Sequence, residues 1–130
     1  ELGHKPPIKE VLEKSRARST IVADAIRSGE VSKVVNKEKQ LKHTIDNKTS
    51  GKSYLNGGLK YAQELIDNLS GTGEPKVDRH GNWVHKEAVV NSKPVGVHVE
   101  PDGQRSESKA AMIVYSKTGS HIYPRKDDDK

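Results

Sequence analysis

Two short segments of the chain combine histidine with cationic and hydroxyl side chains. The first is Lys39-Gln40-Leu41-Lys42-His43, followed closely by Gly51-Lys52-Ser53, and the second is the run from Tyr115 to His121. Cleavage of RNA without a metal needs a base for the 2′-OH proton, an acid for the leaving 5′ oxygen, and donors for the growing phosphoryl charge. The two segments contain these groups. Exposed loops with the same residue types are common, so the composition alone also permits a solvated surface.

Several other kinds of chemistry are excluded by what the sequence lacks. The 130 residues contain no Cys, which removes disulfides, thiol nucleophiles and Cys-based zinc sites. No His-Glu-x-x-His pattern, P-loop, Gly-x-Ser-x-Gly elbow or dinucleotide fingerprint occurs, so no metal or cofactor is predicted. No apolar run approaches the roughly 20 residues that span a bilayer. The net charge of +5 suits a polyanionic partner and also ordinary solubility.

The first half of the chain has helical periodicity. Apolar residues recur at helical spacing within 8–28, predicting one kinked helix or two short ones that end at Gly29. Residues 36–53 are polar and contain little that can be buried. The strongest amphipathic pattern covers 58–69 and is followed by Gly71-Thr72-Gly73, which we interpret as a helix stop rather than a phosphate-binding loop.

The second half has the two-residue period of strands. Strands are expected at 83–85, at 95–99 before a turn, and at 111–115 and 121–123, the last two joined antiparallel by a Gly-containing loop. His121 and Tyr123 would then point to one side, away from Ile122. Helices followed by strands predict an α+β fold with an antiparallel sheet. The expected organisation is a helical segment at 1–36, one domain at 37–124 that ends at Pro124, and a disordered tail at 125–130.

Five motifs occur in an order that resembles a known family. They are KQ-x-KH at 39–43, GKS at 51–53, GTGEP at 71–75, GNWV-x-KE at 81–87 and YSKTGSHIYP at 115–124. Together they resemble the bacterial polymorphic toxin type 50 domain, the C-terminal part of contact-dependent growth inhibition proteins and related secreted toxins. The resemblance covers residues 37–124. Residues 1–36 match nothing and are interpreted as a segment for import into the target cell.

The resemblance implies a ribonuclease of the barnase, EndoU, colicin and RelE-like superfamily, with helices packed on a small antiparallel sheet. Such an enzyme cleaves RNA, here expected to be tRNA, without a metal or other cofactor, and is neutralised by a cognate immunity protein. A host translation factor such as elongation factor Tu is a further expected partner. The resemblance, together with an N-terminal Glu1 in place of Met, implies a fragment of a secreted or cell-surface toxin that is delivered to the cytoplasm of a target bacterium.

The resemblance also assigns roles to individual residues. His43 and His121 are the base and the acid, and the two roles are interchangeable at this stage. Related sequences often have a histidine where this chain has Val114, which places more weight on His43. The remaining assignments are phosphoryl-charge stabilisation by Lys42, hydroxyl donors at Ser53, Thr118 and Ser120, a flanking-phosphate contact at Lys117, base stacking or His121 orientation by Tyr115, nucleotide positioning by Gln40, and substrate binding by Lys39.

Two other functions remain open from the sequence. One is a DNase toxin with similar delivery, which is disfavoured because the Asp and Glu residues are scattered rather than clustered for metal binding. The other is a non-catalytic nucleic-acid-binding module. If the protein is such a module, replacing His43 or His121 with alanine should leave its activity unchanged. Loss of Lys or Arg should instead weaken nucleic-acid binding in a salt-dependent way.

Overall fold

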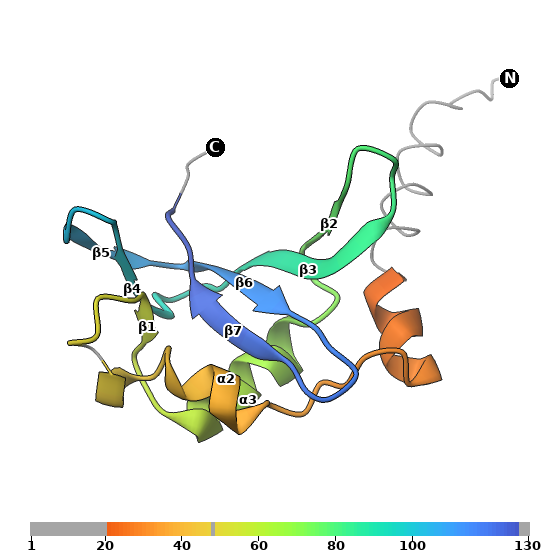
Figure 1. Cartoon of the computed structure of the whole chain (residues 1–130), viewed down its shortest axis with the longest axis horizontal. Coiled ribbons are helices and arrows are strands. Elements are labelled where there is room, and N and C mark those ends of the chain that lie inside the picture. The colour runs from red at the N-terminus through yellow and green to blue at the C-terminus, as the bar shows by residue number, and fades with distance from the viewer. Residues whose placement is uncertain (1–20, 48, 128–130) are drawn as a thin grey trace, which may run out of the picture.

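The computed structural model describes residues 21–47 and 49–127 (Figure 1). Residues 21–28 are helical, and two helices, one 3-10 turn and seven strands follow in this described part of the chain. The bounds are α2 Lys37–Leu41, η1 Ile45–Asn47, β1 Tyr54–Leu55, α3 Leu59–Leu69, β2 Glu74–Val77, β3 Trp83–Val90, β4 Gly96–Val99, β5 Arg105–Ser108, β6 Ala110–Val114 and β7 His121–Pro124. The predicted α+β class is confirmed.

The strands form two antiparallel sheets, one in the order β2-β3-β6-β7 and one in the order β1-β4-β5. The expected pairing of β6 with β7 across a Gly-containing loop is confirmed, with Ile113 opposite Ile122. Strand β3 is longer than predicted. Its second half was missed because it buries a carboxylate, Glu87, at a position where the alternating pattern needs an apolar residue. Strand β5 was not predicted, because its residues are polar and it forms by pairing with β4 across the expected turn.

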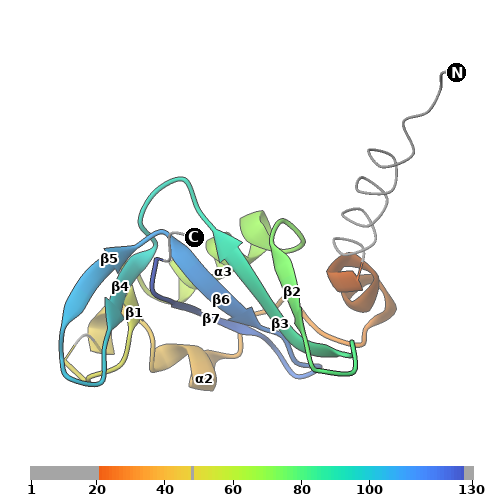
Figure 2. The ribbon, with the colours of Figure 1, turned by 90° about the horizontal axis from the view of Figure 1, so that it is seen from above.

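The core lies between α3 and one face of the four-stranded sheet (Figure 2). The helix predicted at 58–69 is confirmed, and its apolar stripe is buried. The facing sheet residues alternate along their strands, since side chains of neighbouring residues point to opposite faces. The buried residues of this layer are Ala62, Leu65, Ile66 and Leu69 from the helix and Val89, Ala111, Ile113, Tyr115 and Ile122 from the strands or just beyond them.

A buried carboxylate joins the end of α3 to the sheet. Glu87 accepts hydrogen bonds from the backbone N–H of Gly71 at 3.0 Å, the N–H of Gly73 at 2.7 Å and the hydroxyl of Tyr115 at 2.6 Å. Gly71 has φ +83 and ends the helix as predicted, and a Cβ on Gly73 would lie 1.9 Å from the carbonyl oxygen of Ala88. The glycines therefore serve both as the helix stop and as the donors to an internal anion.

The two ends of the described chain are held against the domain. Val22 and Ala25 of the N-terminal helix enter the core, and Gly29 follows the helix with φ +85; the rest of the predicted helix at 8–28 lies outside the described residues. The tail was expected to be disordered from residue 125. In the structure, the backbone N–H of Arg125 donates to the Ala110 carbonyl. The Asp127 carboxylate accepts from the backbone N–H groups of Lys109 and Ala110 at the start of β6. Within the described part of the chain, no helix is long and apolar enough to cross a membrane.

Candidate active site

Three aromatic side chains cluster at the outer edge of the four-stranded sheet. His43 follows α2, whereas His121 and Tyr123 are alternate residues of β7 and point to one side, as predicted. The rings of His43 and His121 are nearly parallel, at 7°, with centroids 6.1 Å apart. The Tyr123 ring lies 5.2 Å from that of His43 and 6.2 Å from that of His121. Both predicted catalytic histidines therefore lie at one site, although 78 residues separate them in the sequence.

Gln40 holds α2 against β7 and so fixes how the two histidines meet. The strand is at the edge of its sheet, and the Ile122 backbone groups on that side need partners. The Gln40 side chain supplies both: its Nε2 donates to the Ile122 carbonyl at 2.8 Å, and its Oε1 accepts from the Ile122 N–H at 2.7 Å. This side chain is fully buried, so it is a positioning group and not the nucleotide contact that was expected.

The orientation of His43 follows from its contact with Ser53. His43 Nδ1 lies 2.8 Å from the Ser53 carbonyl oxygen, which can only accept, so Nδ1 carries the proton and Nε2 of the neutral ring is free to accept one. The Ser53 hydroxyl accepts from the Val99 N–H at 2.9 Å and lies 3.3 Å from Nδ1 of His98. Ser53 was expected to donate to substrate, but its carbonyl and hydroxyl both have partners within the protein. His98 is half-buried in this network.

Burial and nearby lysines keep both imidazoles neutral. Burial lowers the pKa of His43 below its usual 6.5, and Lys52 and Lys42 add to the effect. For His121, burial again contributes most, and the pKa falls to about 4. His43 and the cations Lys39, Lys42 and Lys86 lower it further, in that order.

These lysines form an unpaired positive surface around the two rings. Each of Lys39, Lys42, Lys52 and Lys86 is exposed, and none forms an ion pair with a carboxylate of residues 21–47 or 49–127. The expectation that Lys39 and Lys42 lie at the site agrees with this placement. Lys52 and Lys86 had no assigned role, although Lys52 lies in one of the quoted motifs.

The structure does not bring every predicted residue to the histidine cluster. Tyr115 points to the opposite face of the sheet, where it is 3% exposed and bonded to Glu87, and burial raises its pKa. It therefore cannot stack on a base or orient His121. Ser120 is fully buried and donates to the Ser32 carbonyl. Thr118 lies 3.1 Å from the Ser116 hydroxyl in the exposed β6–β7 loop, which also carries Lys117.

Tyr123 was given no role in the reaction, although the sequence placed it with His121 on a strand face suitable for an active site. The available signal was its two-residue spacing from His121, which puts both side chains on one face of a strand. Lys86 had no comparable signal. It joins the site only through the register, because it is opposite Val114 and Val114 is opposite His121.

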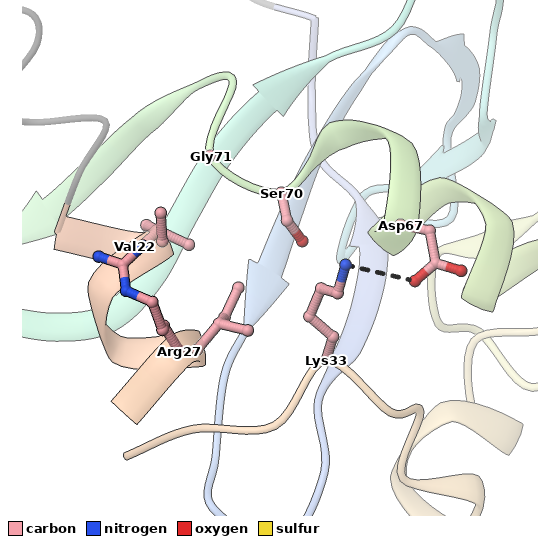
Figure 3. Close-up of a pocket in the computed structure, with 8 residues that line it drawn as sticks. Val22, Arg27, Lys33, Asp67, Ser70 and Gly71 are labelled. Carbon is pink, nitrogen blue, oxygen red and sulfur yellow. Dashed lines mark ion pairs between the residues drawn. The ribbon is translucent and has the colours of Figure 1, made fainter. Parts of the chain in front are cut away.

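A pocket of about 240 Å³ lies elsewhere, between the 21–28 helix and the end of α3 (Figure 3). Its lining includes Val22, Ile26 and Arg27, and the Lys33 ammonium is 4.0 Å from the Asp67 carboxylate at its rim. None of the cluster residues lines it. In the described ranges, no group of three or more His, Asp or Glu side chains is placed to hold a metal ion.

Comparison with known proteins supports the family suggested by the motifs. The sequence model of the family described as Bacterial toxin 50 matches residues 35–124. No curated protein and no solved structure gives a match. The matched range contains α2, both sheets and all of the histidine cluster, and it extends over more than half of the chain. The chain belongs to the Bacterial toxin 50 family.

Proposed function

We propose that this toxin domain is a metal-independent endoribonuclease whose reacting groups are His43 and His121. The observation that carries the proposal is a pair of parallel imidazoles, 6.1 Å apart, surrounded by unpaired lysines. A phosphodiester bound along the nitrogen-bearing edges of the two rings can exchange protons with both, with its charge balanced by the lysine ammonium groups. Neither ring is bound to a carboxylate in the described part of the chain, so both are free to exchange protons with a substrate.

The geometry favours His43 as the base. Its Nδ1–H is directed at the Ser53 carbonyl, which leaves Nε2 unprotonated. Nε2 takes the proton of the ribose 2′-OH, and the 2′ oxygen forms a bond to phosphorus. The bond from phosphorus to the 5′ oxygen breaks, and that oxygen takes the proton of His121. The products are a 2′,3′-cyclic phosphate and a free 5′-OH, and the two histidines have exchanged protonation states.

The positive surroundings of His121 suit this acid role only when substrate is bound. In the free protein, the lowered pKa of about 4 leaves His121 neutral at pH 7. A bound phosphodiester is an anion beside the ring, and an anion favours the protonated form. Lys39 and Lys42 attract that phosphate, and once it is bound its negative charge offsets their lowering of the His121 pKa. The same two cations stabilise the charge that develops on the phosphoryl oxygens.

The biological setting of the proposal follows from the family. A toxin that acts on RNA must be held inactive where it is made, so we include a cognate immunity protein as the partner, and contact-dependent growth inhibition as the delivery system. Its site of action is then the cytoplasm of the target bacterium. The proposed substrate is tRNA, with elongation factor Tu as a candidate host partner.

The test compares the wild-type protein with His43→Ala and His121→Ala, each incubated with total RNA in the presence of a chelator. His80→Ala is the matched control, because His80 is exposed in the β2–β3 turn away from the cluster. We expect discrete RNA fragments from the wild type and the control, and a loss of about 10²- to 10⁴-fold in rate for each of the other variants.

Other outcomes would identify the alternatives. Chelator-sensitive cleavage of DNA with intact RNA would indicate the DNase reading. Salt-dependent RNA binding with no cleavage by any of these proteins would indicate a non-catalytic binding module. In either case the acid–base roles of His43 and His121 would be withdrawn.

A further inference from the structure

The four-stranded sheet has a second face that α3 does not cover. Side chains on this face come from alternate residues of β3, β6 and β7, and the register arranges them in rows that run across the strands. One row is Lys86, Val114 and His121, and the next is Glu74 of β2, Ala88, Met112 and Tyr123. Residues of the opposite face in the same strands, such as Val89 and Ile113, are almost fully buried. The rows therefore lie on the more open side of the sheet.

This open face combines apolar rows with cations on both sides of them, and the outer strand β2 adds Glu74, which is paired with Lys76. Ala88, Met112 and Val114 are half-buried, and Val90 beyond them is 69% exposed. Lys86 lies on the β3 side, and His43, Lys39 and Lys42 lie on the β7 side. Adjacent strands are about 4.8 Å apart, so Lys86 is about 10 Å from His121 across the sheet. A nucleic-acid strand advances about 3.4 Å per nucleotide when stacked and more when its bases are unstacked, so this span corresponds to at most about three nucleotides.

The chemistry of the face specifies the kind of ligand. The cations on both sides attract a ligand whose anionic groups are spaced along its length. The apolar rows between them are best covered by flat, weakly polar groups. Single-stranded RNA meets both needs, because its phosphates repeat along the chain while its unpaired bases stack on or pack against apolar side chains. A duplex would present its phosphates outward and keep its bases away from Met112.

We propose that the open face of β3, β6 and β7 is a track for the single-stranded RNA segment that flanks the scissile phosphate. This rests on the proposed ribonuclease function. Lys86 binds a phosphate within about three nucleotides of the reacting centre, and Met112 with Ala88 receives an intervening base beside Tyr123. The protein would then prefer substrates in which an unpaired stretch of several nucleotides surrounds the cut, as in a loop.

The experiment measures binding of labelled 2′-O-methyl RNA, which lacks the 2′-OH needed for cleavage, by fluorescence anisotropy. Oligonucleotides of two and six nucleotides are compared, with the wild type, Lys86→Gln and Met112→Ser. Lys60→Gln is the matched control, since Lys60 is an exposed lysine on α3, on the other side of the sheet. Lys86 is also exposed, so its replacement leaves the fold intact.

We expect Lys86→Gln to weaken binding of the six-nucleotide RNA about fivefold at about 0.1 M salt and to reduce the log–log salt slope by about 0.7, the effect of losing one phosphate contact. Binding of the dinucleotide, whose single phosphate is held at the histidines, should be weakened less than binding of the six-nucleotide RNA. Met112→Ser should weaken binding of the six-nucleotide RNA and have no effect on the same oligonucleotide without bases. The proposal is overturned if Lys86→Gln and Lys60→Gln bind both lengths equally.

The outcomes also separate this proposal from the proposed function. A wild-type protein that cleaves RNA, with Lys86→Gln equal to the control on long substrates, would retain the ribonuclease and remove the track. A length-dependent loss of binding in Lys86→Gln, with no RNA cleavage by any protein, would retain the track and remove the ribonuclease. If Lys86→Gln weakened only the binding of an acidic protein partner, the face would be a protein interface and the RNA track would be rejected.

Discussion

At the level of single residues, the two imidazoles differ in what surrounds them. His43 is oriented by the Ser53 carbonyl, whereas His121 is held beside several positive charges. In the proposed mechanism, this difference makes His43 the base and His121 an acid that becomes protonated once substrate is bound. It also means that the lysines act on the site in two ways, by attracting phosphate and by setting the protonation of His121.

The protonation of His121 can be measured without a substrate. In the free protein, an NMR titration of the imidazole C–H signals should place the His43 pKa below 6.5 and that of His121 at about 4. Lys42→Gln removes a cation and should raise the pKa of both histidines. Lys60→Gln should leave both unchanged. A pKa for His121 at or above 6.5 in the wild-type protein would contradict this account.

The pH dependence of catalysis follows from the same directions. In the proposed mechanism, the reactive form has a neutral His43 and a protonated His121, so only one of the two imidazoles is positively charged. Because both pKa values lie below 6.5, the population of this form falls about tenfold per pH unit once the pH is above both of them. We expect kcat/KM for a short RNA to rise as the pH is lowered from about 8 to about 6.5. A flat profile over that range would exclude the two-histidine scheme.

At the level of elements, the site depends on one helix being fixed to one strand. The Gln40 side chain behaves as an additional peptide group on the free edge of β7, with one donor and one acceptor placed for Ile122. It closes an edge that would otherwise expose its backbone, and it sets the distance between His43 and His121.

Replacing Gln40 should therefore affect both stability and the site. In Gln40→Leu, the Ile122 N–H and C=O lose their partners in a buried place, at about 1–3 kcal/mol for each group, so the free energy of unfolding should fall by at least about 2 kcal/mol. Urea denaturation measures this loss, and hydrogen exchange at the Ile122 amide should accelerate. Gln104→Leu, in an exposed turn, is the control. An Ile122 amide that remains as protected as in the wild type would show that the clamp is not needed.

A second element-level contact joins the end of α3 to β3 through Glu87. Tyr115→Phe removes one of the three hydrogen bonds to this buried carboxylate, and we expect it to lower the free energy of unfolding by about 1–3 kcal/mol. RNA cleavage should continue at the wild-type rate while the protein is folded, since Tyr115 faces away from the histidines. Tyr61→Phe is the control, because the Tyr61 hydroxyl has no hydrogen-bond partner among the described residues. A selective loss of kcat in folded Tyr115→Phe would restore the original assignment.

At the level of the whole molecule, positive charge is unevenly distributed. Lys39, Lys42, Lys52 and Lys86 converge on one site, although they come from three separate segments of the fold. Such a concentration of cations attracts RNA, and it also makes the site a natural target for an acidic inhibitor.

The cognate immunity protein is accordingly expected to be acidic and to cover or adjoin this site. Its association rate should fall between about 0.1 M and about 1 M salt, where the Debye length shrinks from about 10 Å to about 3 Å. Stopped-flow fluorescence would follow the association. Replacing the four lysines with glutamine should slow association at low salt and remove most of the salt dependence. A rate that is equally fast at both salt concentrations would contradict an electrostatic interface.

The sequence by itself determined the class of fold and the chemical groups of the site. The amphipathic period of α3, the two-residue period of β6 and β7, and the glycines after α3 act locally, so each could be interpreted without knowledge of the rest of the chain. The two catalytic candidates were found in the same way, because a histidine among cations and hydroxyls is visible in a short segment.

Only the tertiary structure decided which of these groups meet. Tyr115 and Ser120 lie in the same motif as His121, yet one faces the core and the other is bonded to Ser32, while Lys86 and Tyr123 reach the histidines through strand register. Gln40 appeared to be a ligand contact because its partner, the Ile122 backbone, is 82 residues away. Local periodicity fixes which side of a strand or helix a residue occupies. Which strands become neighbours, and what each buried polar group then binds, depends on long-range packing that no short segment contains.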